Sequence, residues 1–253
     1  MLNQKPLTEL VFIDIETTSQ HPDFMGIADS KVKELFYKKF EKEIASIPVP
    51  APEQVLTTIS AVEQIYNLKA PLLAEFGKVI AISIGVITEK EGVLKLSTLN
   101  LSGDDEKKLL EEFSVKVKSI CLPKKLAEMK HSIVAYNGLV FDIPFLAKRF
   151  ILNGMQIPVT LDIAGLKPWD IKWVIDPKDH WAMGSWNSHT SLDLLCSCFG
   201  VESSKDDMDG TQVKDAYWKD KALAKISQYC EKDIVALVKV YMKMQGNTSE
   251  LTR

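Results

Sequence analysis

The sequence predicts an α/β domain built on a mixed β-sheet flanked by helices, with a helical insertion after the first strand. Apolar runs of strand length alternate with segments of helical periodicity, in the order three strands, helix, strand, helix, strand and helices. A stretch with helical patterning, about residues 20–74, separates the first strand from the second. With 253 residues, of which 46% are hydrophobic, the chain can bury a full core. We therefore expect a single domain over residues 1–253.

The first strand and the insertion occupy the N-terminal part of the chain. Leu10–Ile15 has apolar residues on both faces, as buried strands do. Ser30–Ile47 has the pattern of an amphipathic helix, and its expected buried stripe is Leu35, Phe36, Phe40 and Ile44. Three prolines then break the helix, at Pro48, Pro50 and Pro52. A second helix is predicted over Glu53–Asn67.

The rest of the chain supplies the other strands and the helices that cover them. We predict strands over Lys78–Thr88, Val93–Leu101, Ser132–Tyr136 and Ile171–Ile175. We predict helices over Asp105–Ile120, Ile143–Leu152, Leu192–Phe199 and Leu223–Met244. Glu91-Gly92 is a turn between two strands, and Gly200 suits a left-handed helix cap.

Composition excludes several classes of protein. The 31 Lys and Arg residues against 34 Asp and Glu give a net charge of −3, unlike a protein that coats duplex DNA. The longest apolar run, Val79–Ile87, is far shorter than the ~20 residues of a membrane span. Met1–Leu10 has no apolar signal-peptide core, so we expect a cytoplasmic protein without membrane contact. We interpret all four cysteines as reduced core thiols: Cys121, Cys196, Cys198 and Cys230.

Acidic residues stand where core residues are expected. Asp14 and Glu16 are two residues apart on a strand and share one face, where like charges need a cation or a raised pKa. The alternative is a strand that runs out into a polar loop, with both acids solvated. Asp142 follows a strand and opens a helix, so helix capping is its alternative role. Asp233 lies on or beside the buried stripe of the last helix, one turn after Tyr229. Its alternative is an edge position facing Lys232 or solvent.

Taken in chain order, the segments that carry these four acidic residues resemble the motifs of the DEDD superfamily of 3′–5′ exonucleases, whose fold is ribonuclease H-like. Phe12–Thr18 is similar to the first motif, Tyr136–Leu146 to the second and Tyr229–Asp233 to the third. The third motif resembles the tyrosine-bearing (DEDDy) kind, because Gln228 occupies the position where the other branch has His. The chain most resembles the predicted 3′–5′ exonucleases related to the proofreading domain of family-B DNA polymerases. Supporting stretches are Glu75–Val79, Ser191–Leu195 and Asp209–Val213.

The resemblance implies an enzyme that hydrolyses terminal phosphodiesters at the 3′ end of single-stranded nucleic acid, with DNA favoured, and releases 5′-nucleoside monophosphates. It implies the catalytic set Asp14, Glu16, Asp142, Tyr229 and Asp233. The four carboxylates would bind two divalent cations, Mg²⁺ or Mn²⁺, with Asp14 as a bridge, because these cations prefer oxygen ligands. Tyr229 would orient the attacking water, since a phenol pKa near 10 makes it a poor base.

Neighbouring residues are candidates for substrate binding, each with a structural alternative. Thr17 can meet the terminal nucleotide or form a turn, and Asn137 can bind sugar or phosphate or make the Asn-Gly turn. Phe141 can stack on a base or pack in the core. Candidate phosphate contacts are Lys148, Arg149 and Lys205, although a solvated helix face explains the first two equally well.

Two other functions stay open at this point. The motifs do not separate DNA from RNA, so the protein can instead be an RNA-trimming 3′–5′ exoribonuclease. It can also be an inactive nucleic-acid-binding module on the same fold, although such a module should have lost a ligand and all four carboxylates are present. The insertion can cover the site, limit substrate length or bind a protein partner, and the sequence identifies no such partner.

Overall fold

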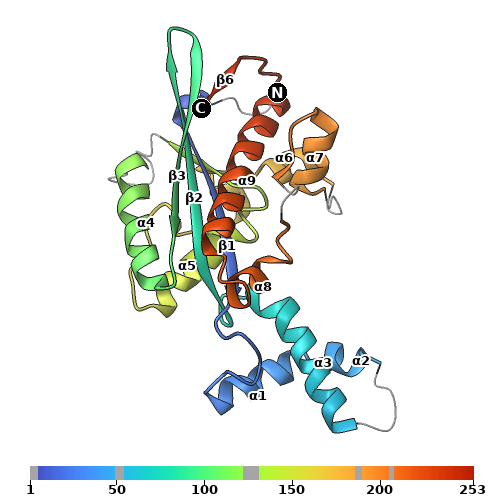
Figure 1. The fold of residues 1–253 in the computed structure, drawn as a ribbon. Helices are drawn as coiled ribbons and strands as arrows, with labels where there is room; N and C mark the ends of the chain where they lie inside the picture. The colour runs from blue at the N-terminus through green and yellow to red at the C-terminus, as the bar shows by residue number, and fades with distance from the viewer. Residues whose placement is uncertain (1–4, 49–53, 122–130, 186–189, 205–207) are drawn as a thin grey trace.

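The computed structural model describes residues 5–48, 54–121, 131–185, 190–204 and 208–253, which form a mixed six-stranded sheet with helices around it (Figure 1). The strand order is β5-β4-β1-β2-β3-β6. β1 pairs antiparallel with β2 and parallel with β4, and β2 pairs antiparallel with β3. The strands are β1 Leu10–Ser19, β2 Gly77–Lys90, β3 Val93–Ser102, β4 Ser132–Val134, β5 Val174–Ile175 and β6 Leu251–Thr252.

The sheet separates two hydrophobic cores. Alternate residues of the central strand β1 point to opposite faces, so Val11 and Ile13 pack with α4 (Glu106–Cys121) and α5 (Asp142–Leu152). Phe12 points the other way, toward α9 (Leu223–Met244), which lies across β1, β2 and β3. Gly85 permits this close approach, because a Cβ atom there would come within 2.6 Å of the Ile234 side chain.

The helices that flank the sheet agree with the expected periodicity. α9 has the predicted bounds, and so does α7 (Leu192–Phe199), which ends at Gly200 with φ of 64°. The remaining helices are α1 Ser30–Lys39, α2 Glu41–Ser46, α3 Gln54–Lys69, α6 Pro177–Ala182 and α8 Val213–Trp218. Short 3₁₀ turns lie at Leu7–Glu9, Ala70–Leu72 and Pro168–Asp170. α1, α2 and α3 form the insertion between β1 and β2 and project from one end of the sheet (Figure 1).

Several local predictions are wrong. The single helix expected over Ser30–Ile47 is two helices, because the backbone leaves helical geometry at Phe40. Phe36, Phe40 and Ile44 are buried as expected, but Leu35, next to Phe36 in α1, is 49% exposed. Strands expected at Ser132–Tyr136 and Ile171–Ile175 are shorter. α6, α8 and β6 were not predicted, as two or six residues carry little periodicity.

The cysteines are all free, and three of them are buried. Cys198 is exposed, so its assignment to the core is wrong: it lies on the solvent side of α7, whereas Cys196 faces the core. None of the helices in the described ranges is long and apolar enough to span a membrane.

Candidate active site

β1 places Asp14 and Glu16 on the face of the sheet that α9 covers. The strand continues to Ser19, four residues beyond its predicted end, and its register with β2 shifts between Glu16 and Thr17. Glu16 is only 8% exposed and Asp14 is partly buried. The alternative of two solvated acids in a polar loop is therefore wrong.

Asp142, which belongs to the second motif, lies close enough to Asp14 and Glu16 for its charge to raise their pKa values. It is the first residue of α5 and is 4% exposed. Burial raises the pKa of the Asp142 carboxyl group to about 7, and the charges of Asp176 and Asp233 contribute. Backbone N–H groups of Asp142 and Ile15 oppose this increase. The carboxyl group thus bonds both to the N–H group at the start of its own helix and to β1 at Ile15.

α9 contributes Tyr229 and Asp233, which are one turn apart. Asp233 accepts a hydrogen bond of 2.5 Å from the Ser204 hydroxyl, and Tyr229 is in hydrogen-bonding contact with its carboxyl group. Burial and the charges of Asp233, Glu16 and Asp14 raise the pKa of Tyr229 well above its usual range. Its phenol therefore stays protonated at neutral pH and acts as a hydrogen-bond donor.

The four carboxylates share one site and repel one another. Burial raises the pKa of Asp14 and Glu16 well above their ordinary values, and the charges of Asp233 and Asp142 raise both further. Within the described residues, no Lys, Arg or His side chain forms an ion pair with Asp14, Glu16 or Asp142. Such a cluster is stable only with protons or cations. A set of carboxylate oxygens fits hard divalent cations better than zinc.

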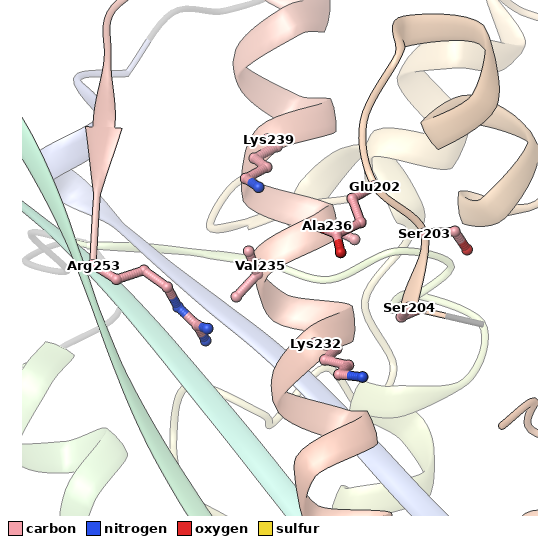
Figure 2. Close-up of a pocket in the computed structure, with 8 residues that line it drawn as sticks. All are labelled: Glu202, Ser203, Ser204, Lys232, Val235, Ala236, Lys239 and Arg253. Carbon is pink, nitrogen blue, oxygen red and sulfur yellow. The ribbon is translucent and has the colours of Figure 1, made fainter. Parts of the chain in front are cut away.

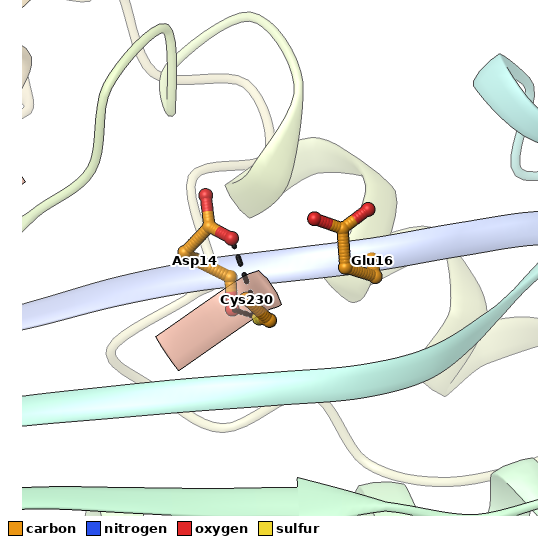
Figure 3. A group of neighbouring side chains, drawn as sticks. All are labelled: Asp14, Glu16 and Cys230. Carbon is orange, nitrogen blue, oxygen red and sulfur yellow. Dashed lines mark hydrogen bonds between the residues drawn. The ribbon is translucent and has the colours of Figure 1, made fainter. Parts of the chain in front are cut away.

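Cys230, which the sequence analysis assigned only to the core, belongs to this cluster (Figure 3). Asp14, Glu16 and Cys230 each offer an atom within 4.8 Å of the others. The Cys230 thiol donates to Asp14 Oδ2 at 3.3 Å and lies 3.4 Å from the Asp14 carbonyl oxygen. The available signal was its position directly after Tyr229 on the buried stripe of α9.

The three candidate substrate-binding residues have different environments. The Thr17 hydroxyl donates to the Pro71 carbonyl at 2.7 Å, so it joins β1 to the insertion. Asn137 adopts φ of 59°, which fits its alternative as a turn residue. Phe141 is partly buried and its ring lies 5.4 Å from that of Phe145. Of the three residues, Phe141 offers a partly exposed aromatic ring, and it directly precedes Asp142 in the chain.

The sequence analysis did not identify Asp176 as a site residue, although its hydrogen bonds hold the start of the second motif in place. Its carboxylate accepts hydrogen bonds from the backbone N–H groups of Asn137 at 2.9 Å and Leu139 at 3.2 Å. Lys178 donates to Asn137 Oδ1 at 3.0 Å. The sequence signal was an Asp directly before a proline, which is a common helix start. It did not indicate the partner, which lies 39 residues away.

The candidate phosphate contacts have three different outcomes. Lys148 is exposed. Arg149 is buried and its guanidinium donates to both carboxylate oxygens of Glu106, so its assignment to a solvated or phosphate-binding face is wrong. It also donates to the Ala74 carbonyl at 2.8 Å and so ties α5 to α4 and to the start of β2. Lys205 lies outside the described residues.

A pocket of about 260 Å³ lies beside α9 (Figure 2). Its lining residues are Glu202, Ser203, Ser204, Lys232, Val235, Ala236, Lys239 and Arg253. Its charged side chains are those of Glu202, Lys232, Lys239 and Arg253, and Arg253 is ion-paired with Glu231 outside the lining. Ser204 joins it to the carboxylate cluster through Asp233.

Comparison of the chain with known protein families identifies the family to which it belongs. A family model described as "Predicted 3'-5' exonuclease related to the exonuclease domain of PolB" matches residues 71–253. The chain belongs to this family. The match includes the second and third motifs, whereas β1 with Asp14 and Glu16 precedes it. Family membership supports an exonuclease that acts on nucleic acid. No curated protein sequence matches the chain.

Among solved structures, the chain is similar to the family B DNA polymerase from the hyperthermophilic archaeon Pyrobaculum calidifontis. The TM-score is 0.50 at 14% identity, over 93% of this chain and 24% of that polymerase chain. The chain thus spans about a quarter of the polymerase's length. At this identity the likeness concerns the fold alone, and it confirms the α/β class with a mixed sheet flanked by helices.

Proposed function

We propose that the protein is a metal-dependent DEDDy 3′–5′ exonuclease that shortens single-stranded nucleic acid, with DNA favoured. Its products would be 5′-nucleoside monophosphates. The observation that carries the proposal is the meeting of four carboxylates from β1, α5 and α9, three of them without a basic partner among the described residues. Membership in a family of predicted exonucleases supports the same reaction, and the family's relation to a DNA polymerase supports DNA.

Asp14, Glu16, Asp142 and Asp233 would hold two divalent cations, Mg²⁺ or Mn²⁺. When bound, these cations would stabilise charge on the attacking and leaving oxygens of the phosphodiester and acidify the attacking water. Tyr229 supplies a protonated phenol beside Asp233, which can orient that water by hydrogen bonding. Ser204 donates a hydrogen bond to Asp233 Oδ1, which would set the orientation of this carboxylate before substrate arrives.

The substrate strand would be held by aromatic and cationic groups around the carboxylates. Phe141 offers a ring on which the terminal base can stack. Thr17 and Asn137 would contribute through their backbone positions, since their side-chain oxygens bond to Pro71 and Lys178. Lys239, which lines the pocket beside α9, would contact a backbone phosphate.

The domain organisation is part of this proposal. Residues 1–253 would act as a single exonuclease domain, with the insertion, about residues 20–74, attached as one of its walls. Two contacts support a fixed attachment: Thr17 to Pro71, and Lys214 of α8, whose ammonium donates to the Pro22 carbonyl at 2.6 Å and to Asn67. An attached insertion would limit which strands reach the carboxylates.

The test uses purified protein with 5′-end-labelled single strands of DNA and RNA, in Mg²⁺ or Mn²⁺ and in EDTA. Stepwise shortening from the 3′ end that requires the cation is the expected result. Digestion from the 5′ end, or activity that survives EDTA, would refute the proposal. Faster turnover of RNA would identify an RNA-trimming enzyme, and strand binding without cleavage would identify an inactive module. Asp14→Ala and Asp233→Ala should each abolish hydrolysis while the fold is retained.

A further inference from the structure

Trp169 is the most exposed aromatic side chain among the described residues, at 69%. It lies in the 3₁₀ turn Pro168–Asp170, whose last N–H group donates to the Lys167 carbonyl at 2.8 Å. Four residues later, Trp173 is buried, and its indole N–H group donates to a backbone carbonyl at 2.9 Å. The indole ring of Trp169 is therefore presented to solvent by an ordered turn with an anchor close behind it.

The Trp169 ring forms part of the wall of a cavity of about 490 Å³. This volume is in the range of protein cavities that bind small ligands. Pro168, Ile171 and Val174 also line it and add apolar surface. A single exposed apolar side chain is ordinary in a folded protein, but an indole that lines an apolar cavity offers a surface on which another flat ring can stack.

The cavity extends to the second motif of the candidate active site. Leu139 of that motif lines it, and so does Asp176. Asp176 accepts hydrogen bonds from the backbone of the second motif, and its charge contributes to the raised pKa of Asp142. Because such an effect requires charges that lie close together, the cavity begins beside one of the candidate metal ligands. A strand with its 3′ end at the carboxylates would therefore have this cavity within reach of its preceding nucleotides.

The charged side chains of the cavity lining balance one another. Lys5 and Lys172 oppose Asp176 and Asp179. His180 also lines the cavity, and because burial lowers its pKa, it adds no charge at neutral pH. Apolar walls without a net charge suit a flat, uncharged ring better than an anion, and a nucleobase is such a ring.

Two lysines flank the indole ring in sequence. The Lys167 ammonium lies 5.3 Å from the centroid of the Trp169 ring. Lys167 is not part of the cavity lining, so the ring turns another part of its surface to the cavity. Lys167 and Lys172 are exposed, and neither forms an ion pair among the described residues. Aromatic rings with cations beside them are what proteins use to bind single strands without sequence preference.

We propose that this cavity, the Trp169 subsite, binds an upstream base of the single-stranded substrate, which stacks on the indole ring while Lys167 and Lys172 contact the adjoining phosphates. Phe141 would take the terminal base at the carboxylates, and Trp169 a base further from the 3′ end. The proposal rests on the function proposed above, and it adds residues 167–172 to the substrate-binding surface. Strands that reach the subsite should bind better than the shortest substrate.

The experiment compares two substrates in Mn²⁺ by kcat and KM. A labelled oligothymidylate of about 10 nucleotides is long enough to reach the subsite. The p-nitrophenyl ester of thymidine 5′-monophosphate contains a single nucleotide and reaches only the carboxylates. Binding of the oligothymidylate is also measured by fluorescence anisotropy in EDTA, which prevents hydrolysis.

The variants are Trp169→Ala, Trp169→Phe and Lys172→Ala. Tyr37→Ala is the matched control, since Tyr37 is an exposed aromatic residue of α1 outside the cavity. Because the Trp169 and Lys172 side chains are exposed, these replacements should leave the fold intact, and circular dichroism checks this.

We expect Trp169→Ala to weaken oligothymidylate binding and raise its KM by about 5-fold or more, because one lost stacking contact has an effect of this size. Its kcat on the oligothymidylate, and both constants on the ester, should stay within about 2-fold of wild type, since a contact made equally in ground and transition states affects KM alone. Trp169→Phe should retain most of the affinity, because a phenyl ring also stacks. Lys172→Ala should have a smaller effect that disappears at high salt. Tyr37→Ala should change nothing.

Two results would overturn the inference alone. Wild-type affinity and KM of Trp169→Ala on the oligothymidylate would show that no base stacks there, and would leave a polypeptide strand along β5, the outermost strand of the described sheet, as the occupant. An equal rise of KM on the ester would place the effect at the carboxylates instead of at a separate subsite.

Failure of the proposed function has a different signature. Wild-type protein that hydrolyses neither substrate would refute the nuclease. If that protein still binds the oligothymidylate and Trp169→Ala weakens the binding, the subsite holds as a single-strand binding site. If it does not bind the oligothymidylate, both proposals are refuted.

Discussion

Replacing Asp14 by Asn should stabilise the metal-free protein while it abolishes hydrolysis. Asp14 stands among Glu16, Asp142 and Asp233, whose charges and burial raise its pKa well above the ordinary value. An amide of the same shape removes one charge from this cluster and can still accept the hydrogen bond from Cys230. Functional sites often cost stability in this way.

The size of the effect follows from the separation of the charges. Carboxylate oxygens of Asp14 and Glu16 lie within 4.8 Å of each other. Two unit charges at that separation repel by about 3 kcal/mol at an effective dielectric constant of about 20. Partial protonation relieves some of this repulsion, so we expect a gain of about 1–3 kcal/mol at pH 8 in EDTA. For a chain of this size, each kcal/mol raises Tm by roughly 2–4 °C.

The gain should depend on pH with a definite sign. The folded-state pKa values of these carboxyl groups are raised, so between about pH 4 and pH 7 the folded protein binds more protons than the unfolded chain. Stability of the wild-type protein in EDTA therefore falls as the pH rises through this window. The advantage of Asp14→Asn should be small at pH 5 and largest at pH 8.

Thermal unfolding in EDTA and in Mn²⁺, from pH 5 to pH 8, tests this reasoning. Mn²⁺ should reverse the order, because the wild-type protein binds the cation more tightly and gains more stability from it. Asp215→Asn is the control: Asp215 is an exposed helix residue paired with Lys219, and its replacement should change Tm little. A loss of stability in EDTA at pH 8, or a gain equal at pH 5 and pH 8, would refute the argument.

Three further predictions concern other parts of the site and fold. Tyr229→Phe should lower kcat about 10- to 100-fold with unchanged Mn²⁺ affinity in calorimetry, because the phenol acts on water; an unchanged rate would remove that role. Arg149→Met should cost about 3–5 kcal/mol in urea unfolding, since it leaves the Glu106 charge buried and unpaired; a loss below 1 kcal/mol would contradict this. Lys239→Glu should raise KM several-fold at low salt and little at high salt, whereas Lys243→Glu, exposed on the same helix outside the pocket, should not; equal effects would exclude a local phosphate contact.

The parts of the fold that sequence predicts well are those with long local patterns. α9 and α7 begin and end where expected, because an apolar stripe and a glycine cap are properties of neighbouring residues. The helix expected over Ser30–Ile47 breaks at Phe40, which its apolar stripe did not indicate. Phe40 and Phe36 pack ring to ring, 4.9 Å apart, in a cluster that includes Tyr66 of α3. Such an aromatic cluster is invisible in a local pattern.

Arg149 shows how a contact distant in sequence changes a residue's role. Its helix position is compatible with solvent or phosphate, yet its guanidinium is buried against Glu106, which precedes it by 43 residues. The pairing of the Arg149 and Glu106 side chains depends on how α4 and α5 lie on one face of the sheet. Hydrophobic periodicity places each helix on that face and contains no information about which charges then meet.

The candidate site likewise has features that the sequence predicts and features that only the folded structure decides. The sequence by itself determined which elements carry acids among apolar residues, because a strand's alternation puts Asp14 and Glu16 on one face and a helix's stripe runs at or beside Asp233. Only the tertiary structure brought them together with Asp142 and added Cys230, since that depends on the register of β1 against β2 and on the close packing of α9 at Gly85. Electrostatic repulsion and hydrogen bonding act over a few ångströms, and only the folded chain brings such distant residues within that range.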